Sequence, residues 1–149
     1  MGAVVAVDWA GWDWHWPRLA TGKQGQDVKA LILISPPWAF KGINLTEVVN
    51  NRQLANQWSW LIVVGDQDNN DLREAKRLHQ SLEKYLPTPA DPAQAAEKQA
   101  VFFLPVATSL QSAKLLAAKK DAIVAEISKF IDRRLVKQGN SWSDRKGPL

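Results

Sequence analysis

Residues 60–68 read WLIVVGDQD, and this stretch decides the fold. Its five apolar residues stop at Gly65, a pattern typical of a strand that is buried on both faces. Two further runs have the same character: VKALILI at Val28–Ile34, and AVFFL at Ala100–Leu104, which ends at Pro105. Strands that are apolar throughout occur mainly in parallel sheets covered on both sides. We therefore expect a parallel sheet of about three strands.

Amphipathic segments lie between and around these runs and predict helices. Asp71 and Glu74 have the spacing of a capping box, which places a helix start at Asp71. Strands that alternate with helices imply right-handed crossovers and a three-layer α/β/α fold. The expected helices are Gly2–Ala10, Thr46–Ala55, Asp71–Leu86 and Leu110–Lys137, the last with a break near Lys119-Lys120-Asp121.

The remaining segments predict loops around one domain. We expect a single domain over residues 1–138, with loops at Trp12–Gln26 and Pro87–Gln99 and a disordered tail at residues 139–149. A chain of 149 residues fits one domain. It has no cysteine, which excludes disulfides, thiolate metal sites and a cysteine nucleophile. No apolar run is long enough to span a membrane, and the N-terminus does not resemble a signal peptide, so the default expectation is a cytoplasmic protein.

The net charge of +4 belongs to the C-terminal part of the chain. Residues 1–113 hold ten Lys/Arg and eleven Asp/Glu, whereas residues 114–149 hold nine and four. Such an excess suits either a nucleic-acid surface or the solvated face of a terminal helix. Because acidic residues are interspersed and no binding motif accompanies the positive charges, we expect no nucleic-acid partner.

Eight tryptophans are unusual for this length, and four of them gather near the N-terminus. Trp12, Trp14 and Trp16 alternate with polar residues, and Trp9 would cap the first helix. The cluster Trp9–Trp16 suits either a stacking platform for a ligand or a strand-like loop with one face packed on the body. We favour packing.

The order of these elements resembles the C-terminal half of an α/β-hydrolase domain. Met1–Ala6 is similar to the helix that follows the nucleophile elbow G-x-S-x-G of that family. Val28–Pro36 looks like the sixth strand, Trp60–Asp68 like the seventh strand with the turn that carries the triad acid, and Ala100–Pro105 like the eighth. The resemblance implies that Asp68 is at the triad-acid position, with Asp66 as its neighbour, and that the nucleophile position lies before Met1.

The resemblance also implies a catalytic histidine soon after the eighth strand, in residues 106–111. That stretch reads VATSLQ, so Thr108 and Ser109 stand where the base is expected. A hydroxyl cannot act as a base near neutral pH. His79 is expected on a helix surface, and His15 precedes the sixth strand, which is the wrong chain order.

The residues favour no metal or cofactor. Two histidines without cysteine make a poor metal set. Asp66, Asp68 and Asp71 lack the glycine and glutamate spacing of a calcium loop. We interpret Asp71 as a helix cap and leave open whether Asp68 is a turn residue or a vestigial triad acid.

The sequence thus predicts an α/β-hydrolase-like domain without competent catalysis in this chain. The alternatives are a fragment of an ester-type acyl hydrolase whose nucleophile lies upstream, or a non-catalytic binding or scaffold domain. In that family the fifth strand lies beside the sixth and would precede Met1. Val28–Ile34 is therefore expected to be an open edge strand, and the chain is expected either to self-associate through this edge or to be only marginally stable.

Overall fold

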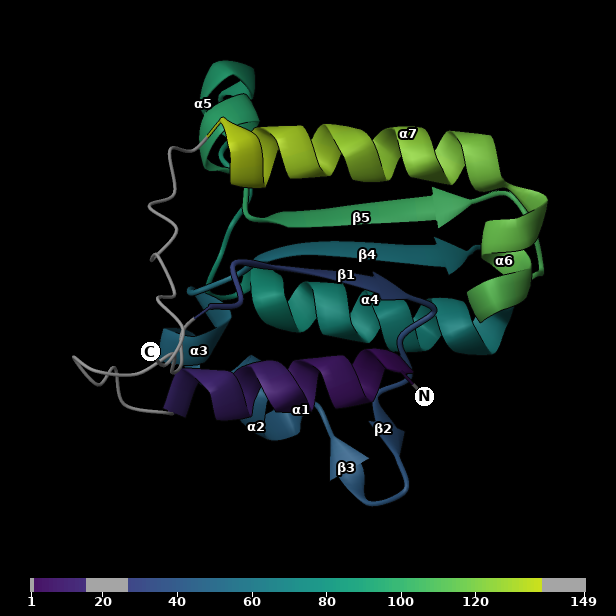
Figure 1. The fold of residues 1–149 in the computed structure, drawn as a ribbon, viewed down its shortest axis with the longest axis horizontal. Helices are drawn as coiled ribbons and strands as arrows, with labels where there is room; N and C mark the ends of the chain where they lie inside the picture. Colours follow the sequence, from purple (N-terminus) through teal and green to yellow (C-terminus); the bar gives the residue numbers. More distant parts are fainter. Residues whose placement is uncertain (1, 16–26, 138–149) are drawn as a thin grey trace, which may run out of the picture.

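Three parallel strands form the centre of the computed structural model, which describes residues 2–15 and 27–137 (Figure 1). The strands are β1 Ala30–Ile34, β4 Ser59–Gly65 and β5 Val101–Val106, in the spatial order β1-β4-β5. Trp60 of β4 has Leu31 of β1 and Val101 of β5 as its partners across the two ladders. The expected three-stranded parallel sheet is confirmed.

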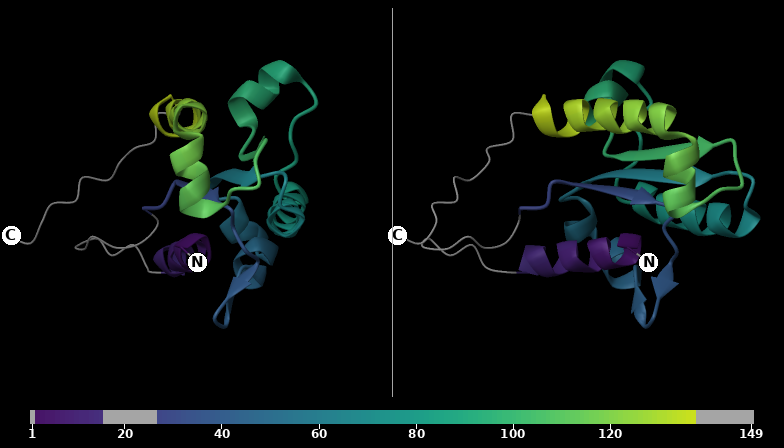
Figure 2. Two further views of the ribbon diagram at one scale, coloured as in Figure 1. Left: turned by 90° about the vertical axis from the view of Figure 1, so that its right-hand side faces the viewer. Right: turned by 45° about the vertical axis from the view of Figure 1, so that its right-hand side comes forward.

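Helices cover both faces of this sheet, so that the fold has three layers (Figures 1 and 2). Trp60, Ile62 and Val64 face α1 Gly2–His15 and α4 Asn69–Glu83. Leu61 and Val63 face α6 Ser112–Ala118 and α7 Lys120–Ile131 on the other side. All seven residues of β4 are buried, which explains why its sequence is apolar without alternation.

Two helix boundaries differ from the prediction because of local capping. The helix α4 begins after Asp68 rather than at Asp71, since the Asp68 side chain caps it. The expected helix Thr46–Ala55 is two short helices, α2 Thr46–Asn50 and α3 Arg52–Ala55, because the Asn51 side chain caps the second. The expected break near Lys119 is confirmed, and α7 continues into η1 Asp132–Val136, a π-helical turn.

Three further features depart from the expectations. The segment 87–99 contains the helix α5 Pro92–Lys98, capped by Asp91, and is not all loop. The strand β5 continues through Pro105 to Val106; a proline is tolerated there because β5 is an edge strand whose outer N–H groups face away from the ladder. A hairpin of β2 Ala39–Phe40 and β3 Ile43–Asn44 turns at Gly42, whose φ of 86° suits glycine.

The tryptophan cluster is helical, which corrects the strand-like loop expected for residues 12–15. Because α1 extends to His15, Trp9 lies within the helix and does not cap it. Trp9 and Trp12 are 60% and 65% exposed, so the expectation that they pack on the body is wrong. Trp14, on the same helix, does pack against the core.

The expected loop at residues 16–26 and the expected tail at 139–149 lie outside the described residues. Within residues 2–15 and 27–137, no helix combines the length and the apolar character needed to cross a bilayer.

The different environments of Trp12 and Trp14 predict different effects on stability. We expect Trp12→Ala to change the free energy of unfolding by less than about 0.5 kcal/mol, because the indole is mostly in solvent. Trp14→Ala should lower it by about 2 kcal/mol, because that ring contacts the core. Urea denaturation of both variants measures the difference, and equal losses in the two would contradict the packing described for α1.

Candidate functional site

The carboxyl ends of β4 and β5 lie side by side, which is where an open α/β sheet usually binds its ligand. The segments that follow the two strands are joined by backbone hydrogen bonds. The Asp66 amide donates to the Val106 carbonyl at 3.0 Å, and the Gln67 amide donates to the Thr108 carbonyl at 3.2 Å. This edge holds Asp68, Thr108 and Ser109, the residues at the expected acid and base positions.

The Asp68 carboxylate is engaged in capping α4. Its Oδ1 accepts hydrogen bonds from the amides of Asn70 at 3.0 Å and Asp71 at 3.2 Å. The positive end of the helix favours a carboxylate at this place. Two interpretations were left open for Asp68, a turn residue or a vestigial triad acid. These hydrogen bonds give it a structural role in the turn, as the cap of α4.

Asp71 does not occupy the N-cap position that was predicted for it. It is the third residue of α4, and burial, followed by the nearby negative charges of Asp68 and Glu74, raises the pKa of its carboxyl. The Glu74 carboxylate accepts a hydrogen bond from the Trp38 amide at 2.9 Å and does not close a capping box with Asp71. The capping-box prediction at Asp71 and Glu74 is therefore wrong, and the N-cap lies three residues earlier.

The hydroxyls at the expected base position serve the loop after β5. Thr108 is buried, and its Oγ1 accepts a hydrogen bond from the Leu110 amide at 3.1 Å. Ser109 is exposed. Within residues 2–15 and 27–137, neither hydroxyl has a charged side chain as its hydrogen-bond partner.

Gln111, the last residue of the stretch in which a histidine was expected, joins the ends of β1 and β4. Its Oε1 accepts from the Gly65 amide at 3.2 Å, and its Nε2 donates to the Gly65 carbonyl at 3.0 Å. The same Oε1 accepts from the Ser35 hydroxyl at 2.6 Å, and the Ser112 amide donates to that hydroxyl at 2.9 Å. We call Ser35, Gly65 and Gln111 the strand-end cluster.

Two members of the strand-end cluster occupy positions that restrict the residue type or the backbone conformation. A Cβ on Gly65 would lie 2.5 Å from the Leu110 carbonyl oxygen and 2.6 Å from that of Thr108, so that only glycine fits. Ser35 is buried with a φ of 47°, in the left-handed region that residues other than glycine seldom adopt. Its hydroxyl is thereby brought to Gln111, and the hydrogen bonds offset the backbone strain.

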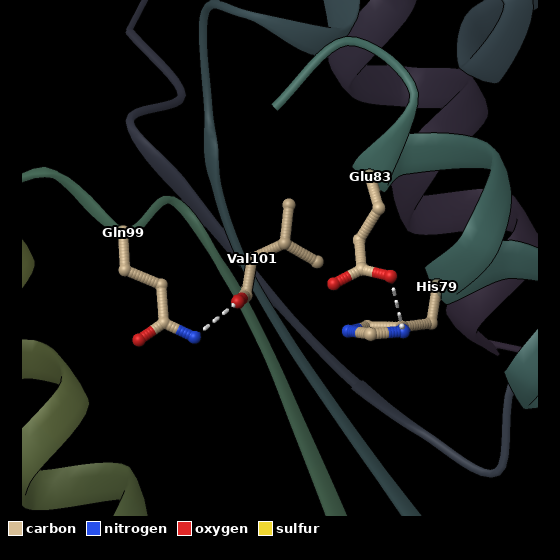
Figure 3. A network of polar contacts seen from close by, with 4 residues as sticks. All are labelled: His79, Glu83, Gln99 and Val101. Atoms are coloured by element: carbon tan, nitrogen blue, oxygen red, sulfur yellow. Dashed lines mark hydrogen bonds and ion pairs between the residues drawn. The ribbon is translucent and has the colours of Figure 1, made fainter. Parts of the chain in front are cut away.

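The two histidines lie elsewhere. His15, at the end of α1, bonds through Nδ1 to the Gly11 carbonyl at 2.6 Å. His79 on α4 lies against the Phe103 ring of β5, with centroids 5.0 Å apart, and its Nδ1 is 3.5 Å from a Glu83 oxygen (Figure 3). His79 is 21% exposed and therefore more enclosed than the surface position expected for it.

His79 is part of the packing between α4 and β5 through its contact with the Phe103 ring. Figure 3 also shows Gln99, whose amide nitrogen donates to the Val101 carbonyl of β5 at 2.8 Å. His79 belongs to this region around the first half of β5, whereas Asp68 follows the carboxyl end of β4. The structure does not bring the predicted acid and a histidine together.

The described part of the chain holds no group of three His, Asp or Glu side chains able to bind a metal ion. Asp66, Asp68 and Asp71 follow one another around the start of α4 without converging.

Sequence reasoning misses Ser35 and Gln111 as partners. In the sequence, Ser35 marks only the end of a strand, and Gln111 only the edge of a helix. The Ser-Pro-Pro sequence after β1 signals a special turn, but the partnership across 76 residues has no local signal.

Substitutions of Asp68 separate its capping role from a role that needs charge. An asparagine side chain keeps an oxygen that can accept both amide bonds, so Asp68→Asn should change stability by only a few tenths of a kcal/mol. Asp68→Ala removes the acceptor and should lower the free energy of unfolding by about 1 kcal/mol. Chemical denaturation of both variants tests this, and equal losses would show that the cap geometry is not what Asp68 contributes.

Gln111→Glu tests the strand-end cluster through its pH dependence. An ionised Glu cannot donate to the Gly65 carbonyl and places negative charge against it, so the variant should be destabilised by about 2 kcal/mol at pH 7. Its folded-state pKa should be raised, because the protonated form can donate. The folded chain then binds more protons, and the loss relative to wild type grows as pH rises from 4 to 7.

Gln80→Glu is the matched control, since Gln80 is exposed on α4. Unfolding of wild type and both variants in urea at pH 4 and pH 7 gives the comparison. A pH-independent loss in Gln111→Glu, or the same trend in Gln80→Glu, would contradict the hydrogen bonds assigned to Gln111.

Comparison of the chain with protein-family models, with curated proteins and with solved structures found no match. The interpretation of the site therefore rests on its own contacts.

Proposed function

We propose that this chain is an α/β-hydrolase-like domain that does not catalyse hydrolysis and works by binding. The carrying observation is that the side chains at the expected catalytic positions hold the backbone together. Asp68 caps α4, and Gln111 pairs with both backbone groups of Gly65. A hydrolase triad would require the acid to orient a histidine that in turn faces a nucleophile.

The chemistry of the replacing groups supports the same proposal. A neutral carboxamide has no protonation equilibrium near pH 7, and a threonine hydroxyl is too weak a base to take a proton from a nucleophile. His79 packs on Phe103 and His15 bonds within its own helix, so that each has a local role.

An ester-hydrolysis assay tests the catalytic part of this proposal. The protein is incubated with an activated p-nitrophenyl ester at pH 7, together with its Asp68→Asn variant, which keeps the cap but not the charge. We expect both to release product at the rate of buffer. Turnover well above that rate in wild type, lost in a folded Asp68→Asn, would instead support an ester hydrolase with Asp68 as orienting acid.

The binding part of the proposal concerns the edge of the sheet. The strand β1 is the first in the order β1-β4-β5, and none of the strands within the described ranges pairs with its outer side. Its five residues are all aliphatic. An apolar edge of this kind offers backbone donors and acceptors to another strand, and we propose that the domain self-associates through it.

A further inference from the structure

A small hollow lies between α7 and the last strand of the sheet, β5, which run alongside each other (Figure 1). Its volume is ≈ 170 Å³. Phe102 and Leu104 of β5 form one wall, and Leu61 of β4 lies at the inner end. Residues spaced by three and four lie on the same side of a helix. The opposite wall is such a row, on α7 and η1, and consists of Glu126, Lys129, Phe130 and Arg133.

The inner part of the hollow is apolar. Leu61 and Phe130 are buried, and the rings of Phe102 and Phe130 meet edge to face with their centroids 5.5 Å apart. An apolar cavity of about 150 Å³ holds a molecule of the size of benzene. The hollow therefore has room for one planar ring and for little more.

The rim of the hollow carries an excess of positive charge. The Lys129 ammonium pairs with the Glu126 carboxylate at 2.6 Å, so that these two charges offset each other. The Arg133 side chain is exposed, and its guanidinium lies 5.9 Å from the centre of the Phe102 ring. Within the described ranges, no carboxylate forms an ion pair with Arg133. One positive charge at the rim is therefore left without a counter-charge among these residues.

A second guanidinium lies close to that of Arg133. Arg134 donates from Nε to the Ser59 hydroxyl at 2.9 Å and from Nη1 to the Glu97 carbonyl at 2.7 Å, so that it is held against the sheet. Burial, followed by the positive charge of Arg133, lowers the pKa of the Arg134 guanidinium. The two arginines thus repel each other, and an anion close to Arg133 is favoured by both charges.

The backbone is irregular at the same place. Arg133 and Arg134 both belong to η1 Asp132–Val136, the π-helical turn that ends this helix. Turns of this type are rare and are found frequently at functional sites. The π-helical turn is an observation independent of the charges, and it marks the same end of the hollow.

A carboxamide completes the lining of the hollow. Gln99 borders it, and the Gln99 Nε2 donates to the Val101 carbonyl at 2.8 Å, which fixes the orientation of the amide. Figure 3 shows that the Gln99 Oε1 lies on the side of the amide that is turned away from β5. An amide oxygen in this position is an acceptor for a further hydrogen-bond donor.

We propose that this hollow binds a small aromatic carboxylate. The ring packs on Phe102 and Phe130, and the carboxylate pairs with the Arg133 guanidinium, whose geometry suits both carboxylate oxygens at once. An inorganic phosphate ion would meet the charge, but it would lose water against the apolar wall without compensation. An uncharged ring would leave Arg133 without an anion. The site lies at the opposite edge of the sheet from β1, so it is independent of the self-association proposed there, which sedimentation velocity tests.

An NMR titration of the isotope-labelled chain with benzoate, at pH 7 and constant ionic strength, tests the ligand class. We expect saturable shifts of the Phe102, Phe103 and Arg133 amides, with a Kd on the order of 1 mM because the ligand is small and the rim is exposed. Acetate supplies the charge without the ring, and benzyl alcohol supplies the ring without the charge. Each should bind at least about tenfold more weakly than benzoate.

Two substitutions at the rim should change the affinity for benzoate in opposite directions. Arg133→Met removes the partner of the carboxylate and keeps an apolar side chain, so it should weaken binding at least about tenfold. Arg52→Met is the matched control, since Arg52 is also exposed but lies on α3, and it should leave the affinity unchanged. Glu126→Gln removes the negative charge at the rim and releases Lys129, so it should tighten binding about two- to fivefold.

The substituted side chains lie at the surface, and the amide spectra of the variants report that they are folded. Weaker binding in Arg133→Met together with tighter binding in Glu126→Gln would support the proposal. The absence of saturable shifts with benzoate would overturn it. Equal shifts with acetate or inorganic phosphate would show a non-specific anion effect and would also overturn it, as would the same affinity in Arg133→Met as in Arg52→Met.

Discussion

Burial of β4 on four sides is the constraint on which the rest of the structure depends. The strand has β1 and β5 on its two edges and helices on its two faces, and all seven residues are buried. Its terminal backbone groups cannot be left without hydrogen bonds in that environment. The chain segments that reach Gly65 must therefore bring their own donors and acceptors.

The strand-end cluster supplies these hydrogen bonds at the carboxyl ends of β1 and β4. Gln111 satisfies both backbone groups of Gly65 and receives the Ser35 hydroxyl, while the Thr108 and Leu110 carbonyls pack where a Cβ would be. A group that donates and accepts at fixed positions suits this task, and a carboxamide does both without titrating. The carboxyl ends of β1 and β4 are therefore held together by neutral groups in closed contacts.

The parts of the fold that were predictable are those with a periodic signal over many residues. The apolar runs located β1, β4 and β5, and the helical stripe located α4, because burial selects residue type along a whole element. The start of α4 was misplaced because Asp68 and Asp71 both suit a cap in sequence, and only the backbone geometry separates them. The helical state of Trp12 has no clear signal in the sequence, because aromatic and polar residues alternate over residues 12–16 as they would in a strand. The pairing of Ser35 with Gln111 joins residues far apart in sequence, and no local pattern records it.

Energetic considerations limit what the proposed association through β1 could gain from backbone pairing alone. Backbone hydrogen bonds between strands replace bonds to water, so each contributes only about 0.5–1.5 kcal/mol net. Association of two chains costs an estimated 4–15 kcal/mol in lost translational and rotational freedom. Backbone pairing along a strand of five residues would therefore leave little net affinity, so apolar side chains beside β1 would have to contribute to the proposed association. Burial of a large exposed apolar side chain such as Trp9 would add about 1.5–3 kcal/mol.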